Sequence, residues 1–283
     1  MKTSQFSLMT FGLTKELIRK TMTVQDTFRM AADTGIHYVD LRWVSEKQIP
    51  EYREAMKATG VTVCCYISAI SFFAKEKMIC KALEREMDIA AKIGAKLFMI
   101  VPYSMFIDPI KAKRMGRSSV LERMVQGFRL AVEKGKAYGL QVCFETTPDE
   151  LIRLSGTEDC RYVLDRVPEL GLVFDTANML PHGDDPVASY EALKDRIVHV
   201  HLKDVALVNA KPSLFEPEMA ADGRLMRGTV FGNGVIPVKE IYERMRTDGY
   251  SGTFAIEYIR PKADCCSLQE HEVHLKSYIK HLM

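Results

Sequence analysis

Residues 170–204 read LGLVFDTANMLPHGDDPVASYEALKDRIVHVHLKD, and this stretch decides the fold. It opens with a short, mostly apolar run at 170–176 and closes with a second one at 197–203. Between them, residues 186–195 have the length and pattern of an amphipathic helix, and Asp185 stands where a helix-capping residue belongs. A strand, a helix and a second strand in this order are typical of the βα units of a parallel sheet.

The same alternation continues along the whole sequence. It predicts eight strands, at residues 6–10, 38–43, 61–69, 96–103, 140–146, 170–176, 197–203 and 253–259. It also predicts eight helices, at residues 24–34, 50–59, 75–93, 118–138, 157–167, 186–195, 237–248 and 268–282. No linker or shift in composition interrupts the repeats, and the Gly-x-Gly-x-x-Gly fingerprint of a dinucleotide-binding sheet does not follow the first strand. The sequence therefore predicts an α/β fold, a single (β/α)8 TIM barrel over residues 1–283.

Composition and charge narrow the class of partner. The 283 residues are 47% hydrophobic and 27% charged, which is enough apolar material for one large core. Lysine and arginine number 39 against 37 aspartate and glutamate, and this balance argues against nucleic acid or an anionic membrane as the partner. A small-molecule partner is then the default. No signal-peptide pattern or apolar membrane span is found, so a cytoplasmic protein is expected, and a homo-oligomer is compatible with the sequence.

The cysteines fit neither a disulfide framework nor a zinc site. Seven are present, an odd number, and four of them form the adjacent pairs 64–65 and 265–266. Structural zinc sites use cysteines spaced two or more residues apart, and disulfide-rich domains are small and secreted. We therefore expect reduced and mostly buried thiols.

Four late strands each end with a potential metal ligand, and these ligands are Glu145, Asp175, His201 and Glu257. Strand alternation turns them toward the barrel axis, while their neighbours face the helices: Phe144, Phe174, Val200 and Ile256. Three carboxylates gathered in the low-dielectric mouth of the barrel repel one another unless a cation neutralises them. Three oxygen donors and one imidazole predict one divalent ion, which is manganese, magnesium, cobalt or zinc. For any single one of the four, a helix-cap or ion-pair role is the alternative.

The run 193–204, LKDRIVHVHLKD, with Asp-Pro at 185–186 before it, resembles the xylose isomerase-like barrels of the sugar-phosphate isomerase/epimerase superfamily. The resemblance covers essentially the whole chain, and the Gly-Asn-Gly turn at 232–234 is similar to a family Gly-x-Gly turn. In that family a Glu, an Asp, a His and a Glu from strands five to eight bind one metal. The resemblance implies the same role here for Glu145, Asp175, His201 and Glu257.

The sequence departs from two subfamilies of that superfamily. Ketohexose epimerases and apurinic endonucleases carry a His three residues after the Asp ligand, where this chain has Asn178. The endonucleases also need further His ligands, and residues 64–69 and 98–103 contain none. Ketohexose epimerases place a Glu and an Arg where this chain has Leu151 and Leu207. These departures argue against a multi-zinc nuclease and against free ketohexoses as substrates.

Other residues on the predicted C-terminal face are candidates for substrate binding, and they are Asn178, His199, Lys203, Trp43, Tyr103 and Arg227. His199 points inward one layer below His201, and a hydrogen-bonded core histidine is its alternative. Lys203 either neutralises an oxyanion or forms a salt bridge at the rim.

Trp43 and Tyr103 close their strands and would stack on a sugar ring or pack at the rim. Arg227 lies in the longest insertion, residues 205–235, and would bind a substrate anion or remain solvated. His271 and His274 on the last helix are expected at the surface.

The function that follows from the resemblance is proton transfer next to a carbonyl. Glu145 and Glu257 are the candidate catalytic residues, because they approach the predicted metal from different strands and would remove and return a proton. We therefore expect a metal-dependent isomerase or epimerase that acts on a sugar, sugar phosphate or related polyol through an enediolate. A metal-dependent lyase or dehydratase acting on a keto-sugar or inosose is the first alternative. A carbohydrate-binding barrel without catalysis is the second.

Overall fold

The computed structural model describes residues 5–102, 114–147, 154, 156–212, 218–259 and 266–283. Eight parallel strands form a closed barrel in the order β1, β10, β7, β6, β5, β4, β3, β2, with β1 also paired to β2. The barrel strands are β1 (Phe6–Met9), β2 (Tyr38–Arg42), β3 (Thr62–Ile70), β4 (Leu97–Pro102), β5 (Gln141–Glu145), β6 (Gly171–Asp175), β7 (Ile197–Leu202) and β10 (Thr253–Ile256). The predicted fold class is therefore confirmed.

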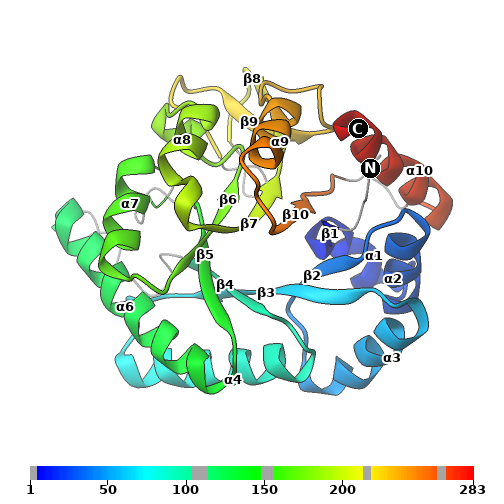
Figure 1. The fold of residues 1–283 in the computed structure, drawn as a ribbon, viewed down its shortest axis with the longest axis horizontal. Coiled ribbons are helices and arrows are strands. Elements are labelled where there is room, and N and C mark those ends of the chain that lie inside the picture. Colours follow the sequence, from blue (N-terminus) through cyan, green and yellow to red (C-terminus); the bar gives the residue numbers. More distant parts are fainter. Residues whose placement is uncertain (1–4, 103–113, 148–153, 155, 213–217, 260–265) are drawn as a thin grey trace.

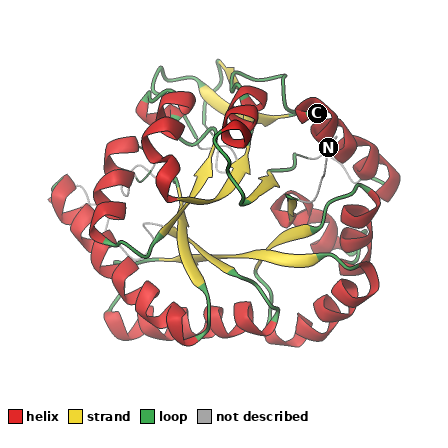
Figure 2. Ribbon diagram, viewed as in Figure 1, coloured by secondary structure: helices red, strands yellow, loops and turns green. Residues whose placement is uncertain are grey.

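Helices surround the barrel as an outer ring (Figures 1 and 2). They are α1 (Thr14–Arg19), α2 (Val24–Asp33), α3 (Ile49–Thr59), α4 (Glu76–Lys92), α6 (Arg117–Ala137), α7 (Thr157–Arg166), α8 (Pro186–Leu193), α9 (Val238–Thr247) and α10 (Leu268–Leu282). The caps follow the sequence chemistry: Asp185 accepts a hydrogen bond from the backbone N–H of Ala188 at the start of α8. In the described part of the chain, no helix has the length and apolar character needed to span a membrane.

The structure contains two features that the sequence pattern did not predict. Helix α1 has only six residues, too few to produce a detectable apolar period. Within the insertion 205–235, β8 (Asp204–Val208) pairs antiparallel with β9 (Leu225–Thr229). Residues 209–224 separate these two strands, so the short turn signal that identifies a hairpin in a sequence is missing. In Figure 1 this hairpin lies at the upper edge of the barrel, next to α8 and α9.

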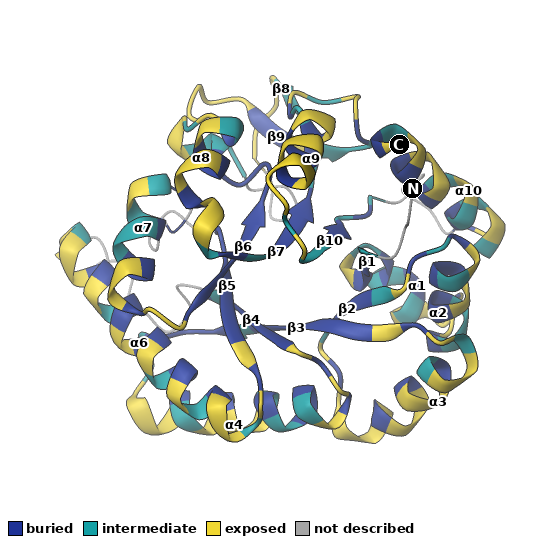
Figure 3. Cartoon of the chain, viewed as in Figure 1, coloured by how far each residue is buried: buried dark blue, intermediate teal, exposed yellow. Residues whose placement is uncertain are grey.

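Two apolar layers follow from strand alternation. The larger one lies between the barrel and the helices and includes Phe144, Phe174, Val200 and Ile256, as predicted. The smaller one fills the barrel interior and consists of Met9, Cys64, Cys65, Ile67, Leu97, Met99, Cys143 and Val173. Figure 3 shows the same division: the strands are buried, while each helix buries one face and exposes the other. None of the six described cysteines is in a disulfide, and five of them are buried, in line with the expectation of mostly buried thiols.

The carboxylate of Asp204 fixes the base of the hairpin. Its Oδ1 accepts hydrogen bonds from the backbone N–H groups of Val205 (2.9 Å) and Ile236 (3.1 Å). Its Oδ2 accepts from Gly232 (2.9 Å) and Gly234 (3.0 Å). A Cβ on Gly234 would lie 2.1 Å from Asp204 Oδ1, so only glycine fits at this position. The predicted glycine turn and the Asp that ends the LKD run are thus one structural unit.

Replacing Asp204 with Asn should lower the stability of the protein. Asp204 is 1% exposed, and an amide can accept hydrogen bonds at only one of its two terminal atoms, so two backbone donors lose their partner. We expect the free energy of unfolding in urea at pH 7 to fall by about 2 kcal/mol. Asp222→Asn, on an exposed carboxylate paired with Arg224, is the matched control and should change little. Equal effects of the two substitutions would contradict the role given to Asp204.

Candidate metal centre

The ends of four adjacent strands bring the predicted ligands together. Glu145, Asp175 and His201 lie at the C-terminal ends of β5, β6 and β7, and Glu257 follows the last residue of β10. One ligand atom from each of the four lies within 4.8 Å of the others. Strand register explains this, because Asp175 pairs with His201 across β6 and β7, and Ala255 pairs with His201 across β10 and β7. The geometry is as predicted, and the role of these side chains as ligands stays a prediction.

The two imidazole nitrogens of His201 face different carboxylates. Nδ1 lies 2.6 Å from Glu145 Oε1, on the side of the cluster. Nε2 lies 3.3 Å from Oδ2 of Asp40, a buried residue of β2. A metal-binding histidine typically uses one nitrogen for the metal and the other for a carboxylate or carbonyl that orients the ring. Nδ1 of His201 therefore faces the four-residue cluster, while the buried Nε2 lies near Asp40 without forming a hydrogen bond with any described residue.

The Asp40 carboxylate is itself held by two buried side chains, Ser7 and His199. Ser7 Oγ donates to Asp40 Oδ1 at 2.6 Å, and His199 Nε2 lies 2.7 Å from Oδ2. Burial alone would raise the pKa of Asp40, but the facing imidazoles of His199 and His201 outweigh burial and lower it. His199 Nδ1 lies 2.7 Å from Thr253 Oγ1, so both of its nitrogens are occupied. His199 therefore sits in the core below the cluster, which is the alternative that the sequence had left open.

The carboxylate of Asp175 provides a test of whether the cluster suits a cation. Oδ1 accepts hydrogen bonds from the backbone N–H groups of Ala177 (2.8 Å) and Asn178 (2.9 Å). Oδ2 is buried and has no hydrogen-bond partner among the described residues. Burial, with the charges of Glu257 and Glu145, raises the pKa of Asp175 well above its usual range. A buried, unpartnered carboxylate oxygen beside two more carboxylates is the arrangement that a divalent cation stabilises, so the residues fit a metal ion.

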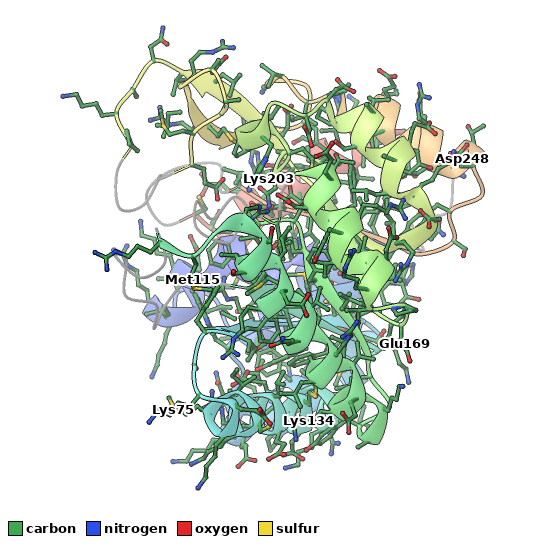
Figure 4. The ribbon with its side chains drawn as sticks, turned by 90° about the vertical axis from the view of Figure 1, so that its left-hand side faces the viewer. Lys75, Met115, Lys134, Glu169, Lys203 and Asp248 are labelled. Atoms are coloured by element: carbon green, nitrogen blue, oxygen red, sulfur yellow. The ribbon has the colours of Figure 1, made fainter. Side chains whose placement is uncertain are left out.

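Lys203 lies at the edge of the cluster, just beyond β7. Its backbone N–H donates to Thr176 Oγ1 at 2.9 Å, and its Nζ lies 3.3 Å from Glu257 Oε1 and 3.2 Å from Asn178 Oδ1. Burial opposes the charge of Lys203, but Glu257 and Glu218 outweigh burial and raise its pKa. Burial likewise opposes the charge of Glu257, and Lys203 and His201 lower the pKa of that carboxylate. Both groups are therefore charged at neutral pH. In Figure 4 Lys203 lies in the interior, while Lys134 and Glu169 lie on the outer surface.

A cavity of about 980 Å³ opens above the cluster, which is room for a small polyhydroxylated molecule. Of the predicted residues, Glu145, Glu257, Asn178 and Lys203 line it. Asn178 is fixed there, because its Nδ2 also donates to the carbonyl of Thr146 at 2.8 Å. Sequence reasoning did not select Arg42, His182 and Glu218, which line the cavity as well. Arg42 follows a buried strand in the same way as the predicted ligands, so the same signal applied to β2 would have identified it.

The remaining candidates lie elsewhere. Trp43 follows β2, is 60% exposed, and has the guanidinium of Arg42 over its ring. Arg227 is an exposed residue of β9, and Tyr103 lies outside the described residues. The expectation that His271 lies at the surface was wrong: it is fully buried, with Nδ1 2.8 Å from the hydroxyl of Tyr258, because α10 turns this face toward the barrel.

Comparison with known proteins places this arrangement in a family. The sequence profile of the xylose isomerase-like TIM barrel family matches residues 28–278, so the chain belongs to that family. An inosose dehydratase of Lacticaseibacillus casei is 23% identical over 223 residues, which cover 78% of this chain and 71% of the relative.

Solved structures of two other proteins match almost the whole chain. The probable 3-DHS dehydratase AsbF of Bacillus anthracis has 20% sequence identity and a TM-score of 0.73, with 98% of each chain covered. The IOLI protein, solved with a zinc atom, has 15% identity and a TM-score of 0.75, again with 98% of each chain covered. At these identities the solved structures support the fold alone, and they agree with the resemblance found in the sequence.

Proposed function

We propose that this protein is a divalent-metal-dependent dehydratase that acts on an inosose or a related cyclic keto-polyol. The sequence favoured an isomerase or epimerase, with a dehydratase as the alternative. The inosose dehydratase and the probable 3-DHS dehydratase among the similar proteins support the alternative better. The observation that carries the proposal is an acid and a base side by side in the cavity, Lys203 and Glu257, with 3.3 Å between their charged atoms.

Glu145, Asp175, His201 and Glu257 would hold the metal. Their three carboxylates and one imidazole form a donor set that suits zinc, manganese, cobalt or magnesium. A bound divalent ion would supply Lewis acidity, polarising a ketone and acidifying the neighbouring C–H bond. The zinc atom in the IOLI structure supports a metal in a barrel of this kind.

The chain's own groups would carry out a balanced elimination. Glu257, kept ionised by Lys203, removes the proton from the carbon next to the ketone, or Glu145 does so from the neighbouring strand. The electron pair of that C–H bond forms a carbon–carbon double bond as the C–O bond on the next carbon breaks. The Lys203 ammonium gives a proton to the departing hydroxyl, and water leaves. The products are the unsaturated ketone and one water, so no oxidant or reductant is needed.

Asn178 and Thr176 would position the acid rather than react. Asn178 Oδ1 accepts from Lys203 Nζ at 3.2 Å, and Thr176 Oγ1 accepts from the Lys203 backbone at 2.9 Å. An amide does not change charge near neutral pH, so Asn178 can orient the ammonium but cannot replace it as a proton donor.

Incubation of the metal-loaded protein in heavy water with an inosose and, separately, with a carboxylated cyclic ketone tests the proposal. We expect a product one water lighter than the substrate, and substrate recovered early should carry deuterium next to the ketone if proton removal is reversible. A product of unchanged mass apart from deuterium at one carbon would identify an epimerase or isomerase instead. Absence of any product with inososes and carboxylated cyclic ketones would favour a binding barrel.

Free ketohexoses should be poor substrates, because Asn178 stands where related epimerases have a histidine. We therefore expect little or no turnover of fructose, psicose or tagatose. Robust 3-epimerisation of any of them would contradict this prediction.

A further inference from the structure

Arg42 is a cation in the cavity that forms no ion pair with any described residue, although it lies close enough to Glu145 to feel the charge of that carboxylate. Two cationic side chains, an arginine and a lysine, are found among the described residues that line the cavity, Arg42 and Lys203. Lys203 is engaged by Glu257 at 3.3 Å and by Glu218 at 3.7 Å. Arg42 forms no hydrogen bond or ion pair with any described residue, and its Nε is buried without a partner. The two terminal nitrogens of its guanidinium therefore remain available to a molecule in the cavity.

Two aromatic rings hold the Arg42 guanidinium in place. Its central carbon lies 4.1 Å from the centre of the Trp43 ring and 5.4 Å from the centre of the Phe11 ring. The two rings contact each other edge to face at 6.1 Å. A guanidinium is attracted to the face of an aromatic ring, and this attraction does not use its N–H donors. Arg42 is thus positioned before a ligand arrives.

The backbone at Trp43 carries strain that serves this arrangement. Trp43 has φ = 59°, in the left-handed region that a bulky residue rarely adopts, and its side chain is 60% exposed. The exposed indole gains little free energy from burial, so burial does not offset the backbone strain. The contact of the Trp43 ring with the Arg42 guanidinium is the interaction that offsets it. Strained residues of this kind concentrate at ligand-binding sites.

Arg42 lies across the mouth of the barrel from the cluster of predicted metal ligands. Strands β5, β6, β7 and β10 are contiguous and carry the predicted ligands, whereas β2 lies four strands from β6 in either direction around the barrel. A ligand that reaches the cluster with one end can therefore reach Arg42 with the other. Partial burial lowers the pKa of Arg42, and the negative charge of Glu145 opposes this effect. A guanidinium stays charged in proteins, so Arg42 remains a cation. A bound anion would therefore offset the free-energy cost of burying this charge.

We propose that Arg42 binds a carboxylate or phosphate group of the substrate, so that the cavity selects an anionic polyhydroxylated compound over its neutral counterpart. The planar guanidinium offers two parallel N–H donors that match either group. This inference rests on the proposed function only in placing the substrate in this cavity. It narrows the substrate from keto-polyols in general to those bearing an acid group.

Calorimetric titration of the manganese-loaded protein with matched pairs of probes tests the inference. Shikimate against methyl shikimate tests a carboxylate, and fructose 6-phosphate against fructose tests a phosphate. We expect wild type to bind the anion of one pair about 10- to 100-fold more tightly than its neutral partner. Arg42→Gln should abolish that preference, and Arg42→Lys should keep part of it. Arg29→Gln, which removes the same charge from the exposed face of α2, should keep all of it.

Two results would overturn the inference: no preference for the anion in either pair, or a preference that survives Arg42→Gln. If that surviving preference is accompanied by a fall in manganese affinity, Arg42 acts on Glu145 and not on the substrate.

Trp43→Gly provides a second variant that does not depend on the charge. Glycine adopts positive φ without strain, so the melting temperature should not fall, whereas the preference for the anion should decrease several-fold because the stacking surface is lost. An unchanged preference would contradict the positioning role of Trp43. All these titrations measure binding of probes that need not react. They can therefore support Arg42 as an anion site even if inosose dehydration fails, and the reverse also holds.

Discussion

Metal-free protein titrated with manganese, cobalt, magnesium or zinc should take up one divalent ion per chain and become more stable. The reason is that the folded chain holds four ligand atoms within 4.8 Å of one another, an arrangement that the unfolded chain lacks. At a free metal concentration of about a thousand times Kd, linkage adds about 4 kcal/mol, which raises Tm by on the order of 10 °C. Elemental analysis and a thermal melt measure the two quantities.

His201→Ala separates the metal from the fold. This variant should stay folded without metal and lose both the bound ion and the rise in Tm, because Nδ1 is gone and Nε2 forms no hydrogen bond that the fold would lose. His37→Ala, an exposed histidine before β2, is the control and should bind metal like wild type. If none of the four metals binds wild type in stoichiometric amount, the metal centre is ruled out. If His201→Ala unfolds, His201 is a structural residue.

Glu257→Gln and Glu145→Gln should each lower kcat by about 10²- to 10⁴-fold on the true substrate. Glutamine keeps the length of the side chain and one oxygen donor but cannot accept a proton from carbon. Each variant should therefore retain part of the metal while losing most activity. Glu243→Gln, on the exposed face of α9, removes the same charge far from the cavity and should leave kcat unchanged.

Solvent exchange then distinguishes a base from a ligand. The rate at which deuterium enters the carbon next to the ketone should fall in whichever variant has lost the base. If one variant exchanges at the wild-type rate, that glutamate serves only as a ligand. If both variants do, neither glutamate is the base. The assignment of the four metal ligands does not depend on this result.

Much of the architecture could be predicted because the alternation of strands and helices is a local property of the sequence. Each of the eight predicted barrel strands overlaps an observed one. The inward-facing residues of β5, β6 and β7 were identified because successive side chains of a strand point to opposite faces of the sheet. The hairpin of β8 and β9 could not be predicted in this way. Its strands meet across residues 209–224, and such pairing depends on tertiary contacts and on the Asp204 turn.

The candidate site was predictable where a charge directly follows an apolar run, as at Asp175 and Glu257. Asp40 was missed because it lies inside β2, where the sequence alone does not show that a facing strand supplies His199 and His201. His271 was misassigned for a related reason. Its burial depends on Tyr258, which follows the neighbouring β10, and helix periodicity does not reveal that contact.

The pairing of β1 with β10 has a consequence for synthesis of the protein on the ribosome. Phe6 of β1 is registered with Phe254 of β10, so the sheet cannot close until almost the whole chain has been made. After β7 ends at Leu202, the ribosome must still add the hairpin and α9 before Ile256 completes β10. At about 5–20 residues per second this takes several seconds. During that interval the nascent seven-stranded sheet presents the open edges of β1 and β7, and these edges must be kept from pairing with other chains.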